Sequence, residues 1–579
     1  MININSDQPA QHSDKIRFLI DQKIPSRDGF DLSADVILPS KGGPFPSVYL
    51  RTPYESSSQK SLDRGVWWAK RGYAFISGDC RGRYESQGEF YPYHPDGKDG
   101  VDTLQWISNQ SWSDGKIGMA GGSYGGLVQW QSAALDSTNI SAMAAHVICD
   151  DYFSNYHYVG GAFQLGLSVM AGITFTTNMP IPGFAEIFDS GRVWRHLPLI
   201  DIDIQTIGKE IPWYRDWLQH SKYDEYWQQI DTTHQYSNVD APVFIRCGWF
   251  DAYPDGTFRL WNGMTKSGAS EQARRGQKVL MGPWTHGEPE GTRLGDLDFG
   301  PDSYKVILEE ELRWFDYWLR GIDNGIDSEP PIHLFVMGIN KWRYESEWPL
   351  ARTQFTPYYF HSVGQANSVY GNGKLSTIKP TDKNSDSYEY DPERPVPTIG
   401  GNHSTASWPW TETGVEPIVV GPVEQRAIES RHDVLVYTSD PLDQDMELTG
   451  PLEVILYASS SAVDTDFTAR LTDVYPDGRS IMMAEGIIRA RFRNGYTEEE
   501  FLQPGKVEEY RIQLYPTSNV FFSGHSLRVD ISSSNFPRFS RNLNTGEDVG
   551  TGVRIEVATQ TIFHSAEYPS HIVLPLIPK

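Results

Sequence analysis

The chain has few cysteines and no long apolar run. Its 579 residues include three cysteines, Cys80, Cys149 and Cys247, and this odd number at wide spacing predicts neither a disulfide framework nor a zinc-ligand pattern. Such a set fits a reducing compartment. No apolar run reaches the roughly 18 residues of a membrane span, and the opening MININSDQPAQHSDK lacks the apolar stretch of a signal peptide. We therefore expect a soluble, cytoplasmic protein.

Positive charge is also scarce. The 50 Lys and Arg residues stand against 75 Asp and Glu residues, which gives a formal net charge of -25. This balance disfavours nucleic acid and anionic membrane surfaces as partners. No His/Asp cluster has metal-ligand spacing, so we expect neither a metal nor a cofactor. A small-molecule substrate is the expected partner, and the sequence leaves open whether the chain forms a homo-oligomer.

The pattern of apolar residues divides the chain into four segments. Residues 1–145 alternate short apolar runs with helical patterns, which predicts a parallel α/β sheet. Residues 146–240 are rich in aromatics, and we expect helices at 152–173 and 213–227 in a cap inserted into that sheet. The strand pattern returns in residues 241–350. Residues 351–579 consist of short alternating runs separated by turn residues, which is typical of an all-β sandwich or jelly roll. The sequence therefore predicts an α/β fold class with a helical cap and a C-terminal β domain.

One serine lies in a setting that predicts catalysis. Residues 121–125 read Gly-Gly-Ser-Tyr-Gly, which fits the G-x-S-x-G pattern of a nucleophile elbow. The strand-like KIGMA precedes it and a helical pattern follows, as such an elbow requires. A glycine-rich turn with an incidental serine is the alternative. The flanking pattern favours Ser123 as a nucleophile, and the backbone amide of Tyr124 then serves as one oxyanion donor.

A serine nucleophile needs a base, and the base needs an acid that orients it. In this fold the expected chain order is serine, acid, histidine. Asp251 follows one apolar strand and His286 follows the next, where the active-site loops of a parallel sheet gather. Asp255 is a rival acid, but it lies in a Pro-Asp-Gly turn that explains it without chemistry. We therefore predict Asp251 as the acid and His286 as the base.

Several separate motifs resemble one family of serine hydrolases. They are RTPY at 51–54, DCRGRYESQGEF at 79–90, GWFDAYPDG at 248–256 and GPWTHG at 282–287. Together they are similar to the family that includes cocaine esterase, α-amino acid ester hydrolases, bacterial glutaryl acylases and X-Pro dipeptidyl peptidases. The resemblance implies an α/β-hydrolase core split by a helical cap, a jelly-roll domain, and the triad Ser123, Asp251 and His286. It also implies that the hydroxyl of Tyr54 is the second oxyanion donor.

The substrate is less well specified by the sequence. Tyr253 and the cap residues Tyr156, Tyr158 and Phe163 suggest an apolar acyl pocket, although such aromatic spacing also suits simple packing. Hydrolysis of carboxylic esters is the leading interpretation. The alternatives are an acylase of β-lactam type, an X-Pro dipeptidyl peptidase, and a binding protein without activity on the same scaffold.

Overall fold

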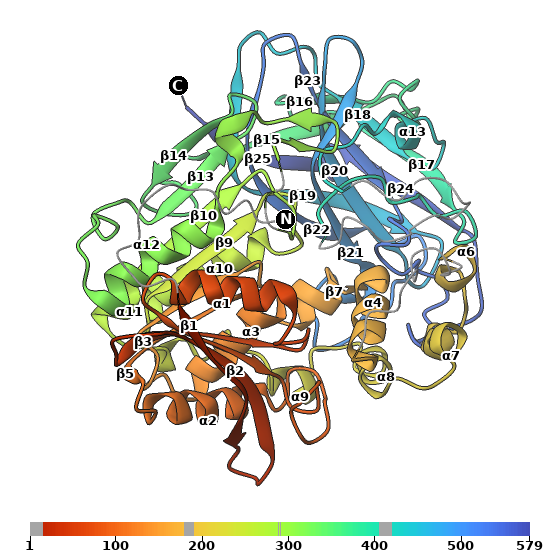
Figure 1. Ribbon diagram of the computed structural model, residues 1–579. Helices are drawn as coiled ribbons and strands as arrows, with labels where there is room; N and C mark the ends of the chain where they lie inside the picture. The colour runs from red at the N-terminus through yellow and green to blue at the C-terminus, as the bar shows by residue number, and fades with distance from the viewer. Residues whose placement is uncertain (1–14, 179–189, 288, 290, 404–419, 579) are drawn as a thin grey trace.

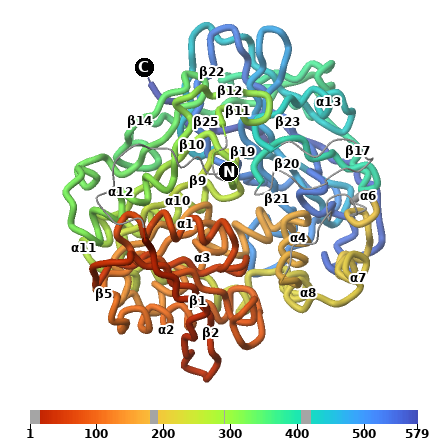
Figure 2. The backbone as a smooth tube through the Cα atoms, viewed as in Figure 1, coloured from red at the N-terminus to blue at the C-terminus, as the bar shows by residue number. Residues whose placement is uncertain are grey.

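The structure, a computed structural model, describes residues 15–178, 190–287, 289, 291–403 and 420–578. Its first part is built on a ten-stranded sheet in the order β1-β2-β4-β3-β5-β6-β9-β10-β13-β14. The strands from β4 to β13 in this order run parallel, and the outer ones are antiparallel. The bounds are β1 Ile16–Pro25, β2 Asp31–Pro39, β3 Phe45–Thr52, β4 Ala74–Asp79, β5 Ser113–Gly122, β6 Ala142–His146, β9 Val243–Gly248, β10 Gln277–Gly282, β13 Ile332–Val336 and β14 Lys341–Glu345. This is the parallel core that the sequence predicts, and the β1–β2 hairpin projects from it (Figure 2).

Helices cover both faces of this sheet. Neighbouring residues of a strand point to opposite faces, and Val48 of β3 joins a cluster with Trp68 and Phe315 while Tyr49 joins the larger core. Helices α1 (Gln59–Ala69) and α12 (Ile307–Arg320) therefore cover one face, with the Trp68 and Phe315 rings 5.7 Å apart. Helices α2 (Asp96–Ser108), α3 (Tyr124–Leu135) and α10 (Pro254–Ser267) contribute their buried residues to the larger core.

The cap lies between β6 and β9, but its helices differ from those predicted. The expected helix at 152–173 is interrupted: its start forms a short π-helix, and the α-helix begins only at Leu165. Gly160 and Gly161 have φ values of 57° and 77°, which glycine adopts readily, and they turn a short hairpin before α4. The expected helix at 213–227 is split into α8 and α9. The elements are π-helix η1 Phe153–His157, β7 Tyr158–Val159, β8 Ala162–Phe163, α4 Leu165–Thr176, α6 Ser190–Trp194, α7 Ile202–Ile207, α8 Pro212–Gln219 and α9 Glu225–Gln228.

The C-terminal part is all-β, as predicted. Its eleven-stranded sheet has the order β17-β24-β19-β22-β21-β20-β23-β18-β16-β15-β25. Because β25 pairs with both β15 and β19, the sheet closes on itself. The bounds are β15 Gln354–His361, β16 Lys374–Ser376, β17 Lys383–Tyr390, β18 Leu435–Thr438, β19 Met446–Ser460, β20 Asp466–Val474, β21 Ser480–Arg489, β22 Glu508–Phe521, β23 Ser526–Ser532, β24 Ala558–Ser565 and β25 His571–Ile577.

The three parts pack together. Helices α4, α6, α7 and α8 of the cap lie on one side of the molecule beside the β domain (Figure 1). The Arg489 amide donates to the Gly160 carbonyl at 2.8 Å, and a Cβ at Gly160 would lie 1.9 Å from the Ile487 carbonyl oxygen. Only glycine permits this approach of cap and β domain.

In the described part of the chain, no helix has the length and apolar character to cross a bilayer. The four segment boundaries remain our proposal.

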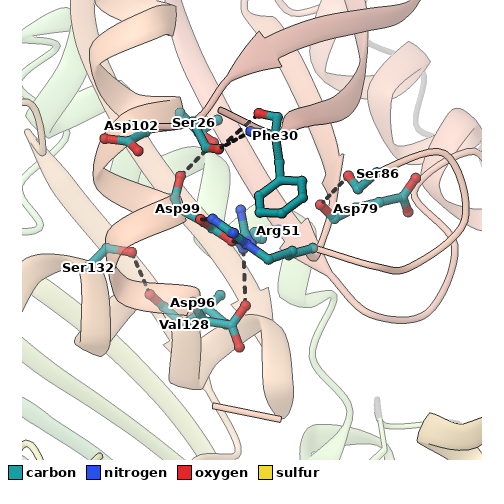
Figure 3. A network of polar contacts seen from close by, with 12 residues as sticks. Ser26, Phe30, Arg51, Asp79, Ser86, Asp96, Asp99, Asp102, Val128 and Ser132 are labelled. Carbon is teal, nitrogen blue, oxygen red and sulfur yellow. Dashed lines mark hydrogen bonds and ion pairs between the residues drawn. The ribbon is translucent and has the colours of Figure 1, made fainter. Parts of the chain in front are cut away.

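A buried ion network fastens α2 to the sheet (Figure 3). Arg51, at the end of β3, donates to Asp96 at 3.3 Å and to Asp99 at 3.0 Å, and these three side chains are almost fully buried. Asp99 also accepts from Arg81 at 3.0 Å. Because buried charges are stable only when paired, this network fixes the first turn of α2 against the carboxyl end of β3.

We predict that Arg51→Met lowers the stability of the α/β part. Asp96 loses its ion-pair partner and Asp99 keeps only Arg81, and removing one partner of a buried pair typically costs about 3–5 kcal/mol. Urea unfolding followed by tryptophan fluorescence measures the shift in midpoint. Arg275→Met is the control, because Arg275 pairs with Glu271 while its side chain is 81% exposed. Equal midpoints for the two variants would contradict the role of the network.

Candidate active site

Ser123 lies at a sharp turn between β5 and α3. Its backbone has φ 56° and ψ -127°, a left-handed conformation that non-glycine residues rarely adopt. The Ser123 amide donates to the His146 carbonyl at 2.9 Å, and its own carbonyl accepts from the Gly126 amide at 2.9 Å. One bond thus ties the turn to strand β6 and the other ties it to the first turn of helix α3. Residues 121–125 therefore have the backbone form of a nucleophile elbow.

Glycines in the motif and directly after it allow this turn to pack closely. At Gly121, which has φ 151°, a Cβ would lie 2.9 Å from Leu50 Cδ1. At Gly126 a Cβ would lie 2.4 Å from Ile148 Cγ2, closer than packed atoms approach. Strand β5 and helix α3 can meet the neighbouring segments this tightly only without side chains at these positions.

Asp251 and His286 are joined by a hydrogen bond. His286 Nδ1 lies 3.1 Å from Asp251 Oδ1, and Asp251 is fully buried while the His286 side chain is 18% exposed. The Ala252 amide also donates to Asp251 Oδ1, at 2.5 Å. Such a bond fixes the ring so that Nε2 is left for another partner. The loops after β9 and β10 thus bring together the predicted acid and base.

Ser123, His286 and Tyr54 line one pocket of about 330 Å³. Asp255, the rival acid, is engaged elsewhere: its carboxylate accepts from Arg259 at 2.8 Å, whereas the hydrogen bond to His286 comes from Asp251. Asp150 also accepts from Arg259, at 2.6 Å. The carboxylate that faces His286 is therefore Asp251.

Tyr54 and Ser123 line the same pocket, and the Ser123 hydroxyl lowers the pKa of the Tyr54 phenol, although burial has the larger and opposite effect. The residue as a whole is 43% exposed, yet the surrounding protein atoms desolvate the phenol, and this loss of solvation raises the pKa of Tyr54 to about 12. The phenol therefore keeps its proton at neutral pH and can act as a donor. The ring stacks on Phe175 of α4 at 6.1 Å, so the cap helps to orient it.

The loop that carries Tyr54 is held by residues of the DCRGR motif. The Asp79 carboxylate accepts from the Ser56 amide at 2.8 Å. Arg83 donates to the Pro53 carbonyl at 2.9 Å and to the carbonyls of Phe175 and Thr177 at 2.8 Å each. Both residues lie in a motif that carries the family resemblance, but the sequence predicts no role for Arg83 or Asp79.

Tyr124 has two separate functions in the structure. It is the first residue of α3, so its amide has no partner within the helix and lies at the positive end of the helix dipole. Its hydroxyl donates to Asp96 Oδ2 and accepts from the Tyr93 amide at 2.9 Å. The ion network around Arg51 thereby anchors the residue that follows Ser123.

A second buried charge, the Glu311 carboxylate, lies behind the elbow and was not predicted from the sequence. Glu311 of α12 is fully buried, bonds His146 Nε2 at 2.9 Å and accepts from Arg64 at 2.6 Å. Burial opposes its ionisation, but Arg64 and His146 outweigh this effect and lower the pKa of Glu311 to about 2. A signal exists in the sequence, because Glu311 interrupts the apolar stripe of an amphipathic helix.

The four predicted substrate residues lie in two places. Tyr253 packs edge-on against His286 with ring centroids 5.6 Å apart, and Tyr156 stacks on Tyr253 at 5.9 Å. Tyr158 and Phe163 pack against each other at 5.2 Å. Both are buried, and the Tyr158 hydroxyl donates to the Trp217 carbonyl. The structure thus places Tyr253 against the base with Tyr156 stacked on it, and the other two in the core of the cap. The residues that line the pocket of Ser123 include none of the four, so their role as a substrate pocket stays a prediction.

Most of the chain matches a known protein family. Residues 28–288 match the family described as X-Pro dipeptidyl-peptidase (S15 family), and residues 324–573 match the X-Pro dipeptidyl-peptidase C-terminal non-catalytic domain. A cocaine esterase of Rhodococcus sp. (strain MB1 Bresler) is 35% identical, and the alignment covers 96% of this chain and 97% of that protein.

Two solved structures share the fold over their whole length. An aminopeptidase from the marine sediment archaeon Thaumarchaeota archaeon superposes with a TM-score of 0.82 at 24% identity, and the match covers 100% of both chains. An α-amino acid ester hydrolase superposes with a TM-score of 0.78 at 23% identity, again over 100% of both chains. The α/β core, cap and C-terminal β domain therefore form a recurring architecture.

We predict that the stability of Asp79→Asn relative to the wild type increases from pH 4 to pH 7. Burial raises the pKa of Asp79 from 3.8 to about 6, so between these values the folded state keeps a proton that the unfolded state loses. Stability of the wild type therefore falls as pH rises through this window, by about 3 kcal/mol in total. The amide introduced by the substitution does not titrate, so the difference in urea midpoint between variant and wild type grows from pH 4 to pH 7. A difference that does not change with pH would contradict the shift.

Proposed function

The chain belongs to the X-Pro dipeptidyl-peptidase (S15) family, and we propose that it is a carboxylic ester hydrolase that works through an acyl-enzyme on Ser123. Its family and its similarity to cocaine esterase support a serine hydrolase that acts on esters or X-Pro amides. One observation carries the assignment of residues. Ser123 with its left-handed backbone, Tyr54, and His286 bonded to Asp251 meet at one pocket.

Ester hydrolysis is favoured over amide hydrolysis by the pattern of similarity. The cocaine esterase is 35% identical and aligned over nearly its whole length. A putative Xaa-Pro dipeptidyl-peptidase of Bacillus anthracis is 22% identical, and the match covers 73% of it. Rates measured side by side on p-nitrophenyl esters, acyl-β-lactams and Xaa-Pro-p-nitroanilides test this preference. A faster rate on a nitroanilide than on every ester would favour the peptidase alternative.

Acylation begins with attack of Ser123 Oγ on the substrate carbonyl carbon. His286 Nε2 accepts the hydroxyl proton as the new bond forms, and Asp251 stabilises the positive charge that develops on the ring. The carbonyl oxygen becomes negative and is stabilised by the Tyr124 amide and the Tyr54 hydroxyl. The bond to the leaving alcohol then breaks, and the alcohol takes the proton from His286.

Deacylation repeats these steps with water. His286 removes a proton from the water molecule, the resulting hydroxide attacks the acyl carbon, and Ser123 leaves with the proton from His286. The two oxyanion donors act again on the second tetrahedral intermediate. Because Tyr54 keeps its proton at neutral pH, it donates in both steps without any change of ionisation.

We predict that a fluorophosphonate probe labels the wild type and does not label Ser123→Ala. The probe forms a covalent bond with an activated serine, so labelling reports the nucleophile directly. Gel fluorescence after incubation gives the result, and mass spectrometry locates the modified peptide. Ser132→Ala in α3 is the control, because Ser132 is a buried serine whose hydroxyl donates to the Val128 carbonyl. Persistent labelling of Ser123→Ala would overturn the assignment.

We predict that Tyr54→Phe lowers kcat by about 10²-fold and leaves KM nearly unchanged. The substitution keeps the ring but removes a donor whose bond strengthens as charge develops on the oxygen. Steady-state kinetics on an ester with rate-limiting acylation measure the change. Tyr390→Phe is the control, because it removes a buried hydroxyl that donates to the Asn542 carbonyl, far along the chain in the β domain. A folded Tyr54→Phe with wild-type kcat would show that the second donor lies elsewhere.

A further inference from the structure

The loop that carries Asp251 satisfies its backbone N–H groups within the α/β core. The Trp249 amide donates to the Gly282 carbonyl at 2.8 Å, and the Phe250 amide donates to the Trp284 carbonyl at 3.0 Å. The Asp251 amide donates to the Gly248 carbonyl at 3.1 Å. Buried backbone groups need such partners. The α/β core therefore supplies acceptors for these three N–H groups, whereas the carbonyls of the loop need donors.

The carbonyls of this loop are bound from the β domain. Asn402, between β17 and β18, donates through Nδ2 to the Trp249 carbonyl at 2.5 Å and to the Asp251 carbonyl at 3.2 Å. Asn402 is 1% exposed, so solvent cannot take over these bonds without rearrangement. A single amide from a segment 151 residues further along the chain therefore bridges both ends of the turn on which Asp251 lies.

Asn402 is itself held firmly. Its backbone amide donates to Glu485 Oε1 at 2.8 Å, and Glu485 also accepts from Asn535 at 2.7 Å and from Arg538. A Cβ at Gly401, which has φ 98°, would lie 1.9 Å from Glu485 Oε1. The carboxylate can therefore reach the Asn402 amide only because residue 401 is glycine.

We infer that Asn402 is a positioning residue of the active site, through which the β domain fixes the orientation of Asp251 toward His286. The inference rests on the proposed role of Asp251 in the triad. Arg538, Glu485 and Asn402 form a continuous chain of hydrogen bonds from the β domain to the loop. Because Asp251 Oδ1 accepts from both the Ala252 amide and His286, a rotation of the turn would move the carboxylate away from the ring.

The experiment is a double-mutant cycle on kcat for a p-nitrophenyl ester. Its members are the wild type, Asn402→Ala, Asp251→Ala and the double variant. We expect Asn402→Ala to lower kcat by about 10²-fold, the usual effect of a small misplacement at a catalytic centre, with KM nearly unchanged. In the Asp251→Ala background the same substitution should lower kcat no further, because there is no carboxylate left to orient. Equal factors in the two backgrounds, or wild-type kcat in Asn402→Ala, would overturn the inference.

Controls separate this result from loss of folding and from failure of the triad. Asn542→Ala removes another buried amide of the β domain, one that donates to Asp464 and Asp466 at 2.7 and 2.8 Å, and it should lower the melting temperature without lowering kcat. If Asn402→Ala does not fold, Asn402→Leu keeps about the size and shape of the side chain but has no group that can donate to the carbonyls, and it completes the same cycle. Wild-type kcat in Asp251→Ala alone would instead refute the proposed triad.

A spectroscopic measurement gives an independent readout. The proton between His286 Nδ1 and Asp251 should give a low-field NMR resonance in the wild type. We expect this resonance to move or disappear in the Asn402 variants and to remain in Asn542→Ala. An unchanged resonance in a folded Asn402 variant would show that the β domain does not control this hydrogen bond.

Discussion

The left-handed backbone of Ser123 is the constraint around which the active site is arranged. A non-glycine residue in this conformation costs about 1–3 kcal/mol, so the surrounding bonds must maintain it. The His146 carbonyl holds the Ser123 amide, and the first turn of α3 holds its carbonyl. The turn directs the side chain into the pocket. The base, the acid and the oxyanion donors are useful only at positions that match this one hydroxyl.

Buried charges support the turn on both faces of the sheet. On one side, Arg51 and Asp96 hold the ring of Tyr124, and on the other, Glu311 holds His146. An apolar core of the same volume can be equally stable, but it tolerates small shifts of its members. Directional bonds allow fewer arrangements. We attribute the choice of ionic contacts here to the precision that Ser123 and the amide after it require.

The sequence predicted the features that local patterns encode. The elbow was visible because strand, glycines, serine and helix are adjacent, and Asp251 and His286 were visible because each follows a strand of the same sheet. The first cap helix was predicted to be continuous, but Gly160 and Gly161 turn the chain between a short π-helix and α4. Contacts such as that of Asn402 with the Asp251 carbonyl join segments 151 residues apart, and no local pattern records them.

The location of these distant contacts follows from the way a parallel sheet uses its backbone. The N–H and C=O groups within the strands are paired in the sheet, but the loops beyond the carboxyl ends keep carbonyls that need donors once they are buried. In this chain some of these donors are side chains of other segments. Arg83 binds the carbonyls of Pro53 and of Phe175 in the cap, and Asn402 binds that of Asp251. The hydrogen bonds that satisfy the buried active-site loops are therefore also bonds that attach the cap and the β domain to the core. The catalytic geometry thus depends on all three parts of the chain.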